Sequence, residues 1–437
     1  MQEEIAACWL RRDLRLHDNT ALYHALKCGK PVLCVFIFDQ AILSQLDDKK
    51  DRRVGFIHQR LRKLNTELEK SGSALIVRYG TVPEVWKKLL DEFPIRHVFA
   101  NHDYEPYAIE RDAMVNDVLR AKNISFLTFK DQVIFEKDEV TKDDGKPYTV
   151  YTPYMKKWRM IAGDEKSAAM KSFQTEKYFS NFKKIKPQAV AGLDQIGFAD
   201  AGTAFPANVP EKNLIIDYAA TRDIPGIRGT SRLGIHLRFG TVSVRELVSK
   251  AWALSDTWVN ELIWREFFMQ ILWHFPHVTD HAFKKEYDKL KWRVDESAFG
   301  KWCKGETGYP IVDAGMRELN ATGFMHNRVR MLTACFLTKY LLIDWRWGEA
   351  YFAQKLLDYE MASNNGNWQW SAGTGCDAAP YFRIFNMEAQ TKKFDPDFTY
   401  IRKWVPEFGG TGYPEPIVDY ETARKRCILF YKNGLER

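Results

Sequence analysis

The stretch RVGFIHQRLRKLNTELEKSGSALIVRY (53–79) contains, in direct succession, the two patterns that decide the fold of the N-terminal part of the chain. The first is a set of apolar residues that recur every three to four positions, as on one face of an α-helix: Ile57, Leu61, Leu64 and Leu68. The apolar, β-branched run at 74–79 then has the length and composition of a buried strand. The stretch therefore predicts a helix that leads directly into a strand.

The same alternation continues on both sides of this stretch. Further strand-like runs occur at Ile5–Leu10, Pro31–Phe38, His97–Ala100 and Ile124–Phe129. Further helical patterns occur at Pro83–Leu90 and Ala108–Ala121. Alternating strands and helices predict an α/β domain with a doubly wound parallel sheet. No GxGxxG motif follows any of these strands, so this domain is not expected to hold a dinucleotide by that route.

The pattern changes twice along the chain. We expect an α/β domain at 1–130, a connection at 131–210 and a large all-α domain at 211–437, where helical patterns are separated by Gly and Pro. The connection is long, and it contains the Tyr- and Lys-rich segment YTVYTPYMKKW (148–158). A connection of this length is expected to lie on the surface.

Composition excludes several classes of protein. The chain has 437 residues, a formal net charge of +7 and 45% hydrophobic residues, without the roughly 18-residue apolar run that a membrane span needs. The N-terminus has no export leader, and the seven cysteines form no CxxC pair or Cys/His cluster. We therefore expect a cytoplasmic protein with no membrane segment, disulfide framework or metal site.

Tryptophan is concentrated in the predicted helical domain. Eleven of the fourteen tryptophans lie at or after Trp252. Burying an indole requires a partner for its N–H, so packing alone rarely explains such an excess. The enrichment suggests a large planar ligand or stacking on nucleic-acid bases. The mildly basic charge is compatible with phosphate binding, but it is not specific.

Two motifs of the helical domain could bind anions or bases. Thr230 and Ser231 lie in GTSRLG (229–234), just before a helical stretch, where hydroxyls, free N–H groups and an arginine can bind a pyrophosphate. An N-cap without a ligand explains the same residues. In WVNELIWREFF (258–268), Glu261 and Trp264 share a face with an arginine and a phenylalanine. This face could be a pocket wall or a surface Glu–Arg pair beside a partly buried Trp.

Two further motifs combine charge with aromatic residues. The run MHNRVRM (325–331) places Arg328 and Arg330 in an otherwise apolar helix, so acidic partners must exist, and Asp358 and Glu360 are the candidates. Without such partners the run would be a solvated helix face. The segment from Asp358 to Trp370 contains Asn-Asn-Gly (364–366), which is typical of a turn, close to two tryptophans.

Together these segments resemble the photolyase/cryptochrome flavoproteins, and among them most closely the class I enzymes for cyclobutane pyrimidine dimers. The resemblance covers nearly the whole chain and rests on WLRRDLRLHDNTAL (9–22), GTSRLG (229–234), NELIWREF (260–267), KGETGYPIVDAGMREL (304–319), HNRVRM (326–331), LLIDWR (341–346), NNGNWQW (364–370) and AAPYFRIFN (378–386). It implies an α/β antenna domain, a helical FAD-binding domain and light-dependent repair of these dimers in DNA. In such repair an electron passes from excited FADH⁻ to a dimer that has flipped out of the helix, at a cost of a few kcal/mol.

The resemblance also assigns roles to individual residues. The implied FAD-binding residues are Tyr218, Thr230, Ser231, Arg232, Leu233, Gly234, Trp258, Arg330, Asp358, Tyr359, Glu360 and Asn364. The implied contacts to damaged DNA are Arg222, Glu261, Trp264, Arg265, Asn327, Arg328, Met331 and Trp370. Glu261 and Asn364 are the implied catalytic residues, and the implied electron relay comprises Trp368, Trp345 and Trp292.

A second chromophore is possible, but its identity stays open. Folate-type antennas in this family use an Asn-Glu pair shortly after a Tyr-Glu, and here Tyr104-Glu105 is followed by Pro106, Tyr107 and Ala108. A folate antenna is therefore not expected, whereas a deazaflavin, another flavin or an empty site remain alternatives.

Three other functions compete with dimer repair. A photoreceptor of the cryptochrome type tends to lose the Glu–Trp pair that Glu261 and Trp264 represent here. A (6-4) photoproduct enzyme needs two pocket histidines, and Asn327 and Met331 stand in those places. A non-catalytic DNA-binding module would not need the FAD motifs. We expect a monomer that acts on DNA containing pyrimidine dimers.

Overall fold

The computed structural model of the chain describes residues 3–164 and 170–436. They form two compact units, and the chain passes between them more than once. The first unit comprises Met1–Glu136, Met160–Val209 and Leu233–Lys250, and the second comprises Lys137–Arg159, Pro210–Arg232 and Ala251–Arg437. Domain borders near residues 130 and 210 stay a prediction, and residues 165–169 of the predicted connection lie outside the described residues.

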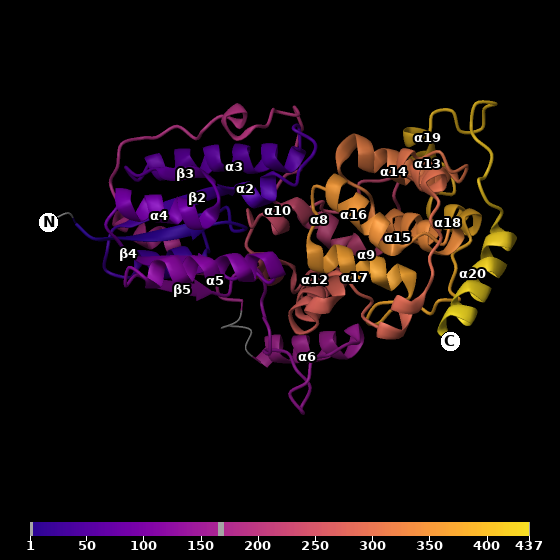
Figure 1. Cartoon of the computed structure of the whole chain (residues 1–437), viewed down its shortest axis with the longest axis horizontal. Coiled ribbons are helices and arrows are strands. Elements are labelled where there is room, and N and C mark those ends of the chain that lie inside the picture. Colours follow the sequence, from indigo (N-terminus) through magenta and orange to yellow (C-terminus); the bar gives the residue numbers. More distant parts are fainter. Residues whose placement is uncertain (1–2, 165–169, 437) are drawn as a thin grey trace. The chain divides into compact units, whose positions relative to one another are not determined.

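A parallel sheet forms the centre of the first unit (Figure 1). Its five strands, within the part of the chain that is described, are β1 (Ile5–Leu10), β2 (Val32–Asp39), β3 (Leu75–Gly80), β4 (Ile95–Asn101) and β5 (Ser125–Phe129). Their order is β3-β2-β1-β4-β5, and every neighbouring pair is parallel. β1 and β2 are buried along their whole length, as expected for strands covered on both faces. The predicted doubly wound sheet is confirmed.

The helices of the first unit are α1 (Thr20–Leu26), α2 (Gln40–Leu43), α3 (Arg52–Glu69), α4 (Val82–Glu92) and α5 (Pro106–Arg120), followed later in the chain by η1 (Thr175–Asn181), η2 (Leu193–Ile196), α10 (Gly234–Arg238) and α11 (Val244–Ala251). Of these, α3, α4 and α5 confirm the three helical patterns that the sequence predicts between strands. The Ser243 hydroxyl accepts a hydrogen bond from the Glu246 amide and thereby caps the start of α11.

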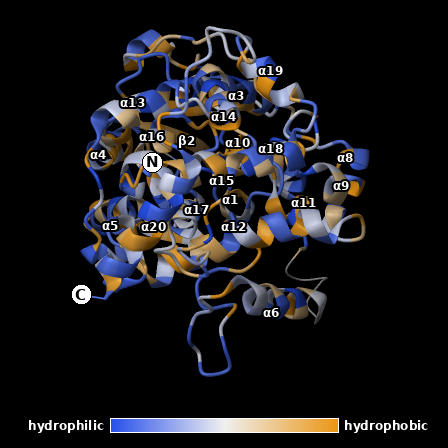
Figure 2. Cartoon of the chain, turned by 90° about the vertical axis from the view of Figure 1, so that its right-hand side faces the viewer, coloured by the Kyte–Doolittle hydropathy of each residue, from blue (hydrophilic) through white to orange (hydrophobic). Residues whose placement is uncertain are grey.

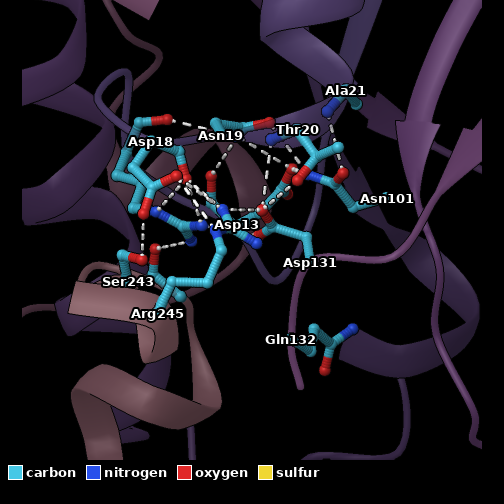
Figure 3. Close-up of polar contacts among 12 residues, drawn as sticks. Asp13, Asp18, Asn19, Thr20, Ala21, Asn101, Asp131, Gln132, Ser243 and Arg245 are labelled. Carbon is cyan, nitrogen blue, oxygen red and sulfur yellow. Dashed lines mark hydrogen bonds and ion pairs between the residues drawn. The ribbon is translucent and has the colours of Figure 1, made fainter. Parts of the chain in front are cut away.

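A buried polar network connects α11 with the loop after β1 (Figure 3). The Arg245 guanidinium lies 2.9 Å from both Asp18 and Asp131, and Arg15 lies 2.7 Å from Asp131. All four side chains are at most 5% exposed. Burial of charge is tolerated when it is paired and hydrogen-bonded, and this network meets that condition. It therefore joins segments more than 110 residues apart in the sequence.

The second unit is helical. It contains most of α6 (Tyr151–Asp164), then α8 (Lys212–Ile216), α9 (Tyr218–Thr221), α12 (Asp256–His274), η3 (Pro276–Thr279), η4 (Lys285–Lys289), α13 (Glu296–Lys304), α14 (Pro310–Thr322), α15 (Asn327–Cys335), the π-helical turn η5 (Phe336–Tyr340), α16 (Trp345–Lys355), α17 (Met361–Ala372), α18 (Met387–Phe394), α19 (Thr399–Trp404) and α20 (Tyr420–Leu435). In α12, Val259, Leu262, Ile263, Phe267 and Ile271 recur at helical spacing and are buried. The predicted α/β and all-α fold classes are both confirmed.

The described helices combine hydrophobic with hydrophilic residues. Figure 2 shows hydrophobic and hydrophilic residues mixed along the helices. Within residues 3–164 and 170–436, no helix is both long and apolar enough to cross a bilayer.

Candidate functional site

A pocket of about 590 Å³, measured with its open side, lies among the helices of the second unit. Its lining comes from α15, α16, α17 and the segment at 356–360. The predicted site residues among its lining are Asn327, Arg330, Met331, Asp358, Tyr359, Glu360, Asn364, Trp368 and Trp370. The remaining lining residues are Ala334, Phe352, Leu356, Ser363, Asn367 and Ser371. One wall is thus apolar and aromatic, whereas charged and amide groups converge on another part.

The Asn-Asn-Gly segment is helical, so the predicted turn at 364–366 is wrong. It lies in the second turn of α17, which runs without interruption from Met361 to Ala372. Asn364 and Trp368 are four residues apart and both line the pocket. Asn365 and Gln369 bond instead to the carbonyl of Val278, at 2.8 and 3.0 Å. The polar residues that suggested a turn are therefore bonded on separate faces of one helix.

Glycine permits α17 to lie very close to its neighbours. A Cβ at Gly366 would stand 2.1 Å from the Phe268 ring of α12. A Cβ at Gly348 of α16 would stand 2.1 Å from the Trp368 ring of α17. Neither position tolerates a side chain without movement of its neighbour. The close approach of the helix backbone to an aromatic ring explains why glycine occurs at both positions, although its helix propensity is low.

Ion pairing holds the charged part of the pocket lining. Arg330 lies 2.9 Å from Asp358, as predicted, and its Nε also donates to the carbonyl of Met325 at 2.8 Å. Arg328 contacts Asp223 at 2.6 Å, and Glu360 pairs with Arg265 at 3.0 Å. The prediction that Asp358 and Glu360 serve the two arginines is therefore correct for Arg330 only. Asp223 is 105 residues away from Arg328, and no local pattern indicates that contact.

Asn364 is fixed by a carboxyl group that the sequence analysis missed. Its amide nitrogen donates to the Glu349 side chain at 2.8 Å and to the Glu349 carbonyl at 3.1 Å. Burial raises the pKa of Glu349, and the hydrogen bond from Asn364 opposes this effect. The orientation of the amide is thus set by α16, with its oxygen left for another partner.

His326 caps the start of α15. Its Nδ1 accepts a hydrogen bond from the Arg328 amide at 3.2 Å, so the proton of the neutral ring is on Nε2. The residue is 3% exposed, and burial, followed by the nearby Arg330, lowers its pKa to about 4. The neutral imidazole therefore orients the first turn of α15, on which Asn327 and Met331 lie.

A second group of predicted residues lies at the start of α12. Glu261 and Arg222 form an ion pair of 2.5 Å, and the Arg222 guanidinium lies 5.3 Å from the centre of the Tyr218 ring. Burial raises the pKa of Glu261, whereas Arg222 opposes that rise. Next to them, Tyr151 stacks on the Trp264 indole with ring centroids 3.5 Å apart and an angle of 6°. Tyr151 donates to the Asn260 carbonyl, and no sequence pattern marked it.

The remaining predicted cofactor residues are not among those that line the pocket. Thr230, Ser231 and Arg232 precede α10, and Arg232 has a positive φ of 52° with its guanidinium 4.2 Å from the Phe324 ring. Leu233 and Gly234 belong to the first unit, where Leu233 precedes α10 without a side-chain cap. Trp258 is buried in α12.

The predicted tryptophan relay is only partly traceable through ring contacts. Trp368 lies 6.0 Å from Trp302, which was not assigned a role. Trp345 is buried at the start of α16, and Trp292 contacts Phe430 at 5.2 Å. A backbone bridge between residues 293 and 343 brings the segments of Trp292 and Trp345 side by side.

Comparison with known proteins agrees with this architecture. Residues 6–171 match the family model "DNA photolyase", and residues 258–411 match "FAD binding domain of DNA photolyase". A deoxyribodipyrimidine photo-lyase of Alkalihalophilus pseudofirmus is 36% identical over 99% of both chains. The chain belongs to the photolyase/cryptochrome family. Its helical unit contains the FAD-binding domain of that family.

Two solved structures are similar over nearly the whole chain. A bacterial class III photolyase from Agrobacterium tumefaciens has a TM-score of 0.87 and 32% identity, covering 100% of this chain and 99% of its own. An archaeal photolyase from Sulfolobus tokodaii, which holds two FAD molecules, has a TM-score of 0.78 and 33% identity, covering 98% of this chain and 100% of its own.

In the described part of the present chain, no group of three or more His, Cys, Asp or Glu side chains is arranged to hold a metal ion.

Replacing Gly366 with alanine should destabilise the second unit. The added methyl group would overlap the Phe268 ring, and overpacking of this kind costs about 1–3 kcal/mol. Gly300→Ala, in the middle of α13 with no atom near the added Cβ, should be neutral or stabilising by up to about 1 kcal/mol. Urea denaturation measures both values, and equal effects of the two substitutions would contradict this packing argument.

Stability should decrease as pH falls through the titration range of His326. The pKa of this histidine is lowered from 6.5 to about 4 in the folded chain, so the unfolded chain binds more protons between these values. His326→Asn retains a capping side chain and should flatten the decline between about pH 6.5 and about pH 4. The exposed His281→Asn variant is the control. An unchanged pH dependence in His326→Asn would show that another group causes the decline.

Proposed function

We propose that the chain repairs cyclobutane pyrimidine dimers in DNA in a light-dependent reaction, as a deoxyribodipyrimidine photo-lyase. The observation that carries the proposal is that Asn327, Met331 and Trp370 line one pocket together with Asn364. The same helical unit contains the Glu261–Arg222 pair and the stacked Trp264. Family membership supports the proposal independently, because the curated relatives are named deoxyribodipyrimidine photo-lyase at about 36% identity.

The pocket has the chemistry that a flavin ring requires. The ring is planar and largely apolar with hydrogen-bonding groups along one edge, and the pocket offers Met331, Phe352 and Trp368 beside polar groups. The Ser371 hydroxyl, which lines the pocket and is 6% exposed, has no hydrogen-bond partner within the part of the chain that is described. A buried hydroxyl of this kind is consistent with a polar ligand.

We assign the cofactor-binding roles on this basis. Arg330, Asp358, Tyr359, Glu360 and Asn364 would hold the flavin ring and the chain attached to it. On the family resemblance, further contacts to FAD, including its phosphates and ribose, would come from Tyr218, Thr230, Ser231, Arg232, Leu233, Gly234 and Trp258. Reduced FAD, when bound, supplies an electron to the dimer on absorbing light and takes it back after two C–C bonds of the cyclobutane ring have broken.

The residues of this chain then have the tasks of binding and orientation. Trp264 and Trp370 offer flat apolar surfaces to a flipped-out dimer, and Tyr151 keeps the Trp264 indole in one plane. Glu261 would accept or share a hydrogen bond at the base edges. Burial raises the pKa of Glu261, and the ion pair with Arg222 opposes that rise. Asn364 is positioned by Glu349, so its amide does not need to reorient when a ligand enters.

DNA phosphates would be bound by arginines close to the pocket. Arg222, Arg265 and Arg328 are the candidates. Arg222 and Arg328 have side chains that are 27% and 21% exposed, so solvent ions and phosphates can reach them. Arg265 is 10% exposed and paired with Glu360, so it is the least accessible of the three candidates. Phosphate binding of this kind weakens as salt rises, because counterions compete with the protein.

Two alternatives are less well supported. A (6-4) photoproduct enzyme would place histidines where Asn327 and Met331 line the pocket. His326 does not replace them, because its ring caps α15. A photoreceptor without repair activity would not need the set of Glu261, Trp264 and Trp370.

For the cellular setting, we propose a monomer that acts in the cytoplasm.

Blue light should restore intact pyrimidines when the reduced, FAD-loaded protein is mixed with an oligonucleotide that contains a dimer. Glu261→Gln should lower the repair yield about tenfold or more, because hydrogen bonds to charged groups contribute about 1.5–3 kcal/mol. The exposed Glu286→Gln variant controls for loss of one charge. Liquid chromatography of the digested oligonucleotide measures the yield. No restoration by the wild-type protein, with its flavin fully reduced, would exclude repair and favour the photoreceptor alternative.

The tryptophan relay has its own test. We propose that Trp368, Trp345 and Trp292 supply electrons to the pocket from the surface, with Trp368 as the member that lines it. Trp368→Phe should slow the light-induced reduction of oxidised FAD, followed by absorbance, while leaving repair by pre-reduced protein largely intact. Loss of both activities would mean that Trp368 has a packing role only.

A further inference from the structure

Four charged side chains form one balanced group beside the start of α12. Arg222 lies 2.5 Å from Glu261 and 3.9 Å from Asp223, and Arg328 lies 2.6 Å from Asp223. Asp223 thus contacts both guanidiniums, whereas Glu261 contacts Arg222. Two positive and two negative charges face one another, so the group carries no net charge when all four are ionised.

Groups other than Asp223 also hold the two arginines in place. The Arg328 guanidinium lies 4.4 Å from the centre of the Phe394 ring, and its Nη1 lies 3.8 Å from the sulfur of Met331. Arg222 is held by Glu261 and by the face of Tyr218. Aromatic faces and sulfur position a cation without neutralising its charge. Removing the Asp223 carboxylate would therefore leave Arg222 paired with Glu261, whereas Arg328 would lose the carboxylate that balances its charge.

The Arg328 guanidinium also has unused hydrogen-bonding capacity. Its Nε is buried and has no partner among the residues that the structure describes. Leaving a buried donor of a charged group without an acceptor costs free energy. The Arg328 guanidinium is therefore not fully satisfied by its present partners. A phosphate oxygen would have to compete with Asp223 for this guanidinium.

The carboxylate of Asp223 acts electrostatically on its surroundings. It contributes to raising the pKa of Glu261, after the larger effect of burial, because two negative charges repel each other. A DNA phosphate that approaches Arg222 or Arg328 would meet the same repulsion. Asp223 is 41% exposed on its side chain, so it faces the solvent from which DNA would arrive.

We propose that Asp223 is a specificity-determining residue, a shared counter-charge for Arg222 and Arg328 that weakens binding to the phosphate backbone of undamaged DNA. This inference rests on the proposed function. Binding to undamaged DNA is almost wholly electrostatic, so it is strongly affected by one carboxylate at the phosphate contacts. Dimer binding has additional contributions from stacking and hydrogen bonding. A residue that keeps the electrostatic contribution to DNA binding low therefore makes tight binding depend on contacts with the dimer. The protein then discriminates between damaged and undamaged DNA by means of a repulsive interaction.

The test compares Asp223→Asn with Asp217→Asn in the same segment. Asp217 is exposed at the start of α9 and caps that helix with no side-chain hydrogen bond. Both variants lose one negative charge, but only Asp223 contacts the two arginines. Fluorescence anisotropy gives the affinities of the full-length protein for an undamaged duplex and for the same duplex with one thymine dimer, over a range of salt concentrations.

Asp223→Asn should bind the undamaged duplex several-fold more tightly than the wild-type protein at low salt. The slope of log K against log salt should steepen by about 0.9, which corresponds to one additional phosphate neutralised. The advantage should therefore shrink about threefold to fourfold between about 50 and about 200 mM salt. Asp217→Asn should show little change. An unchanged or weaker affinity in Asp223→Asn, with an unchanged slope, would overturn the inference.

The same substitution made in an Arg328→Gln variant separates electrostatic repulsion by Asp223 from a structural role of that residue. If Asp223 acts through the arginines, its substitution should have a much smaller effect in Arg328→Gln than in the wild-type protein. An equal effect in both backgrounds would show that Asp223 acts elsewhere and would overturn the inference. The wild-type protein tests the proposed function separately: equal affinity for damaged and undamaged duplexes would contradict dimer recognition, whatever the result for Asp223.

Discussion

The close packing of α17 against α12 and α16 is the constraint on which the pocket depends. Gly366 admits the Phe268 ring, and Gly348 admits the Trp368 ring. Gln369, three residues after Gly366 and therefore on a neighbouring side of the helix, bonds to the carbonyls of Val278 and His281 and to the amide of Phe283. These contacts fix the rotation of α17 and with it the direction of the face that carries Asn364. The short motif at 364–370 thus contains both the residues that pack α17 against its neighbours and residues that line the pocket.

Paired charge is the second organising rule, and it operates in both units. In the first unit, Asp18 and Asp131 are buried with Arg245 and Arg15 (Figure 3). In the second, Arg330 is paired with Asp358 at the pocket, and the pairs are more exposed. Fully buried pairs connect distant segments, whereas half-buried pairs can exchange partners with a ligand. Because of this difference, we propose phosphate binding for the arginines beside the pocket and not for those of the first unit.

The sequence predicted the fold well because its signals were local. Hydrophobic periodicity located the strands and the helices α3, α4 and α5 between them, and these agree with the structure. Prediction was wrong where packing overrode local preference: Asn-Asn-Gly is typical of turns, but at 364–366 each residue has a partner that only the folded chain provides. The partners Asp223, Glu349 and Tyr151 were missed because they come from distant segments or carry no motif. The family resemblance named pocket residues, but it gave none of these contacts.

The central claim is that one pocket of the helical unit holds the flavin and receives the dimer. A crystal structure of the FAD-loaded protein bound to a dimer-containing duplex tests it most directly. The account predicts density for the flavin ring against Arg330, Asn364 and Trp368, with the dimer flipped out of the duplex between Trp264 and Trp370. A flavin bound elsewhere, or a dimer left stacked in the duplex while the protein contacts only the phosphates, would contradict it.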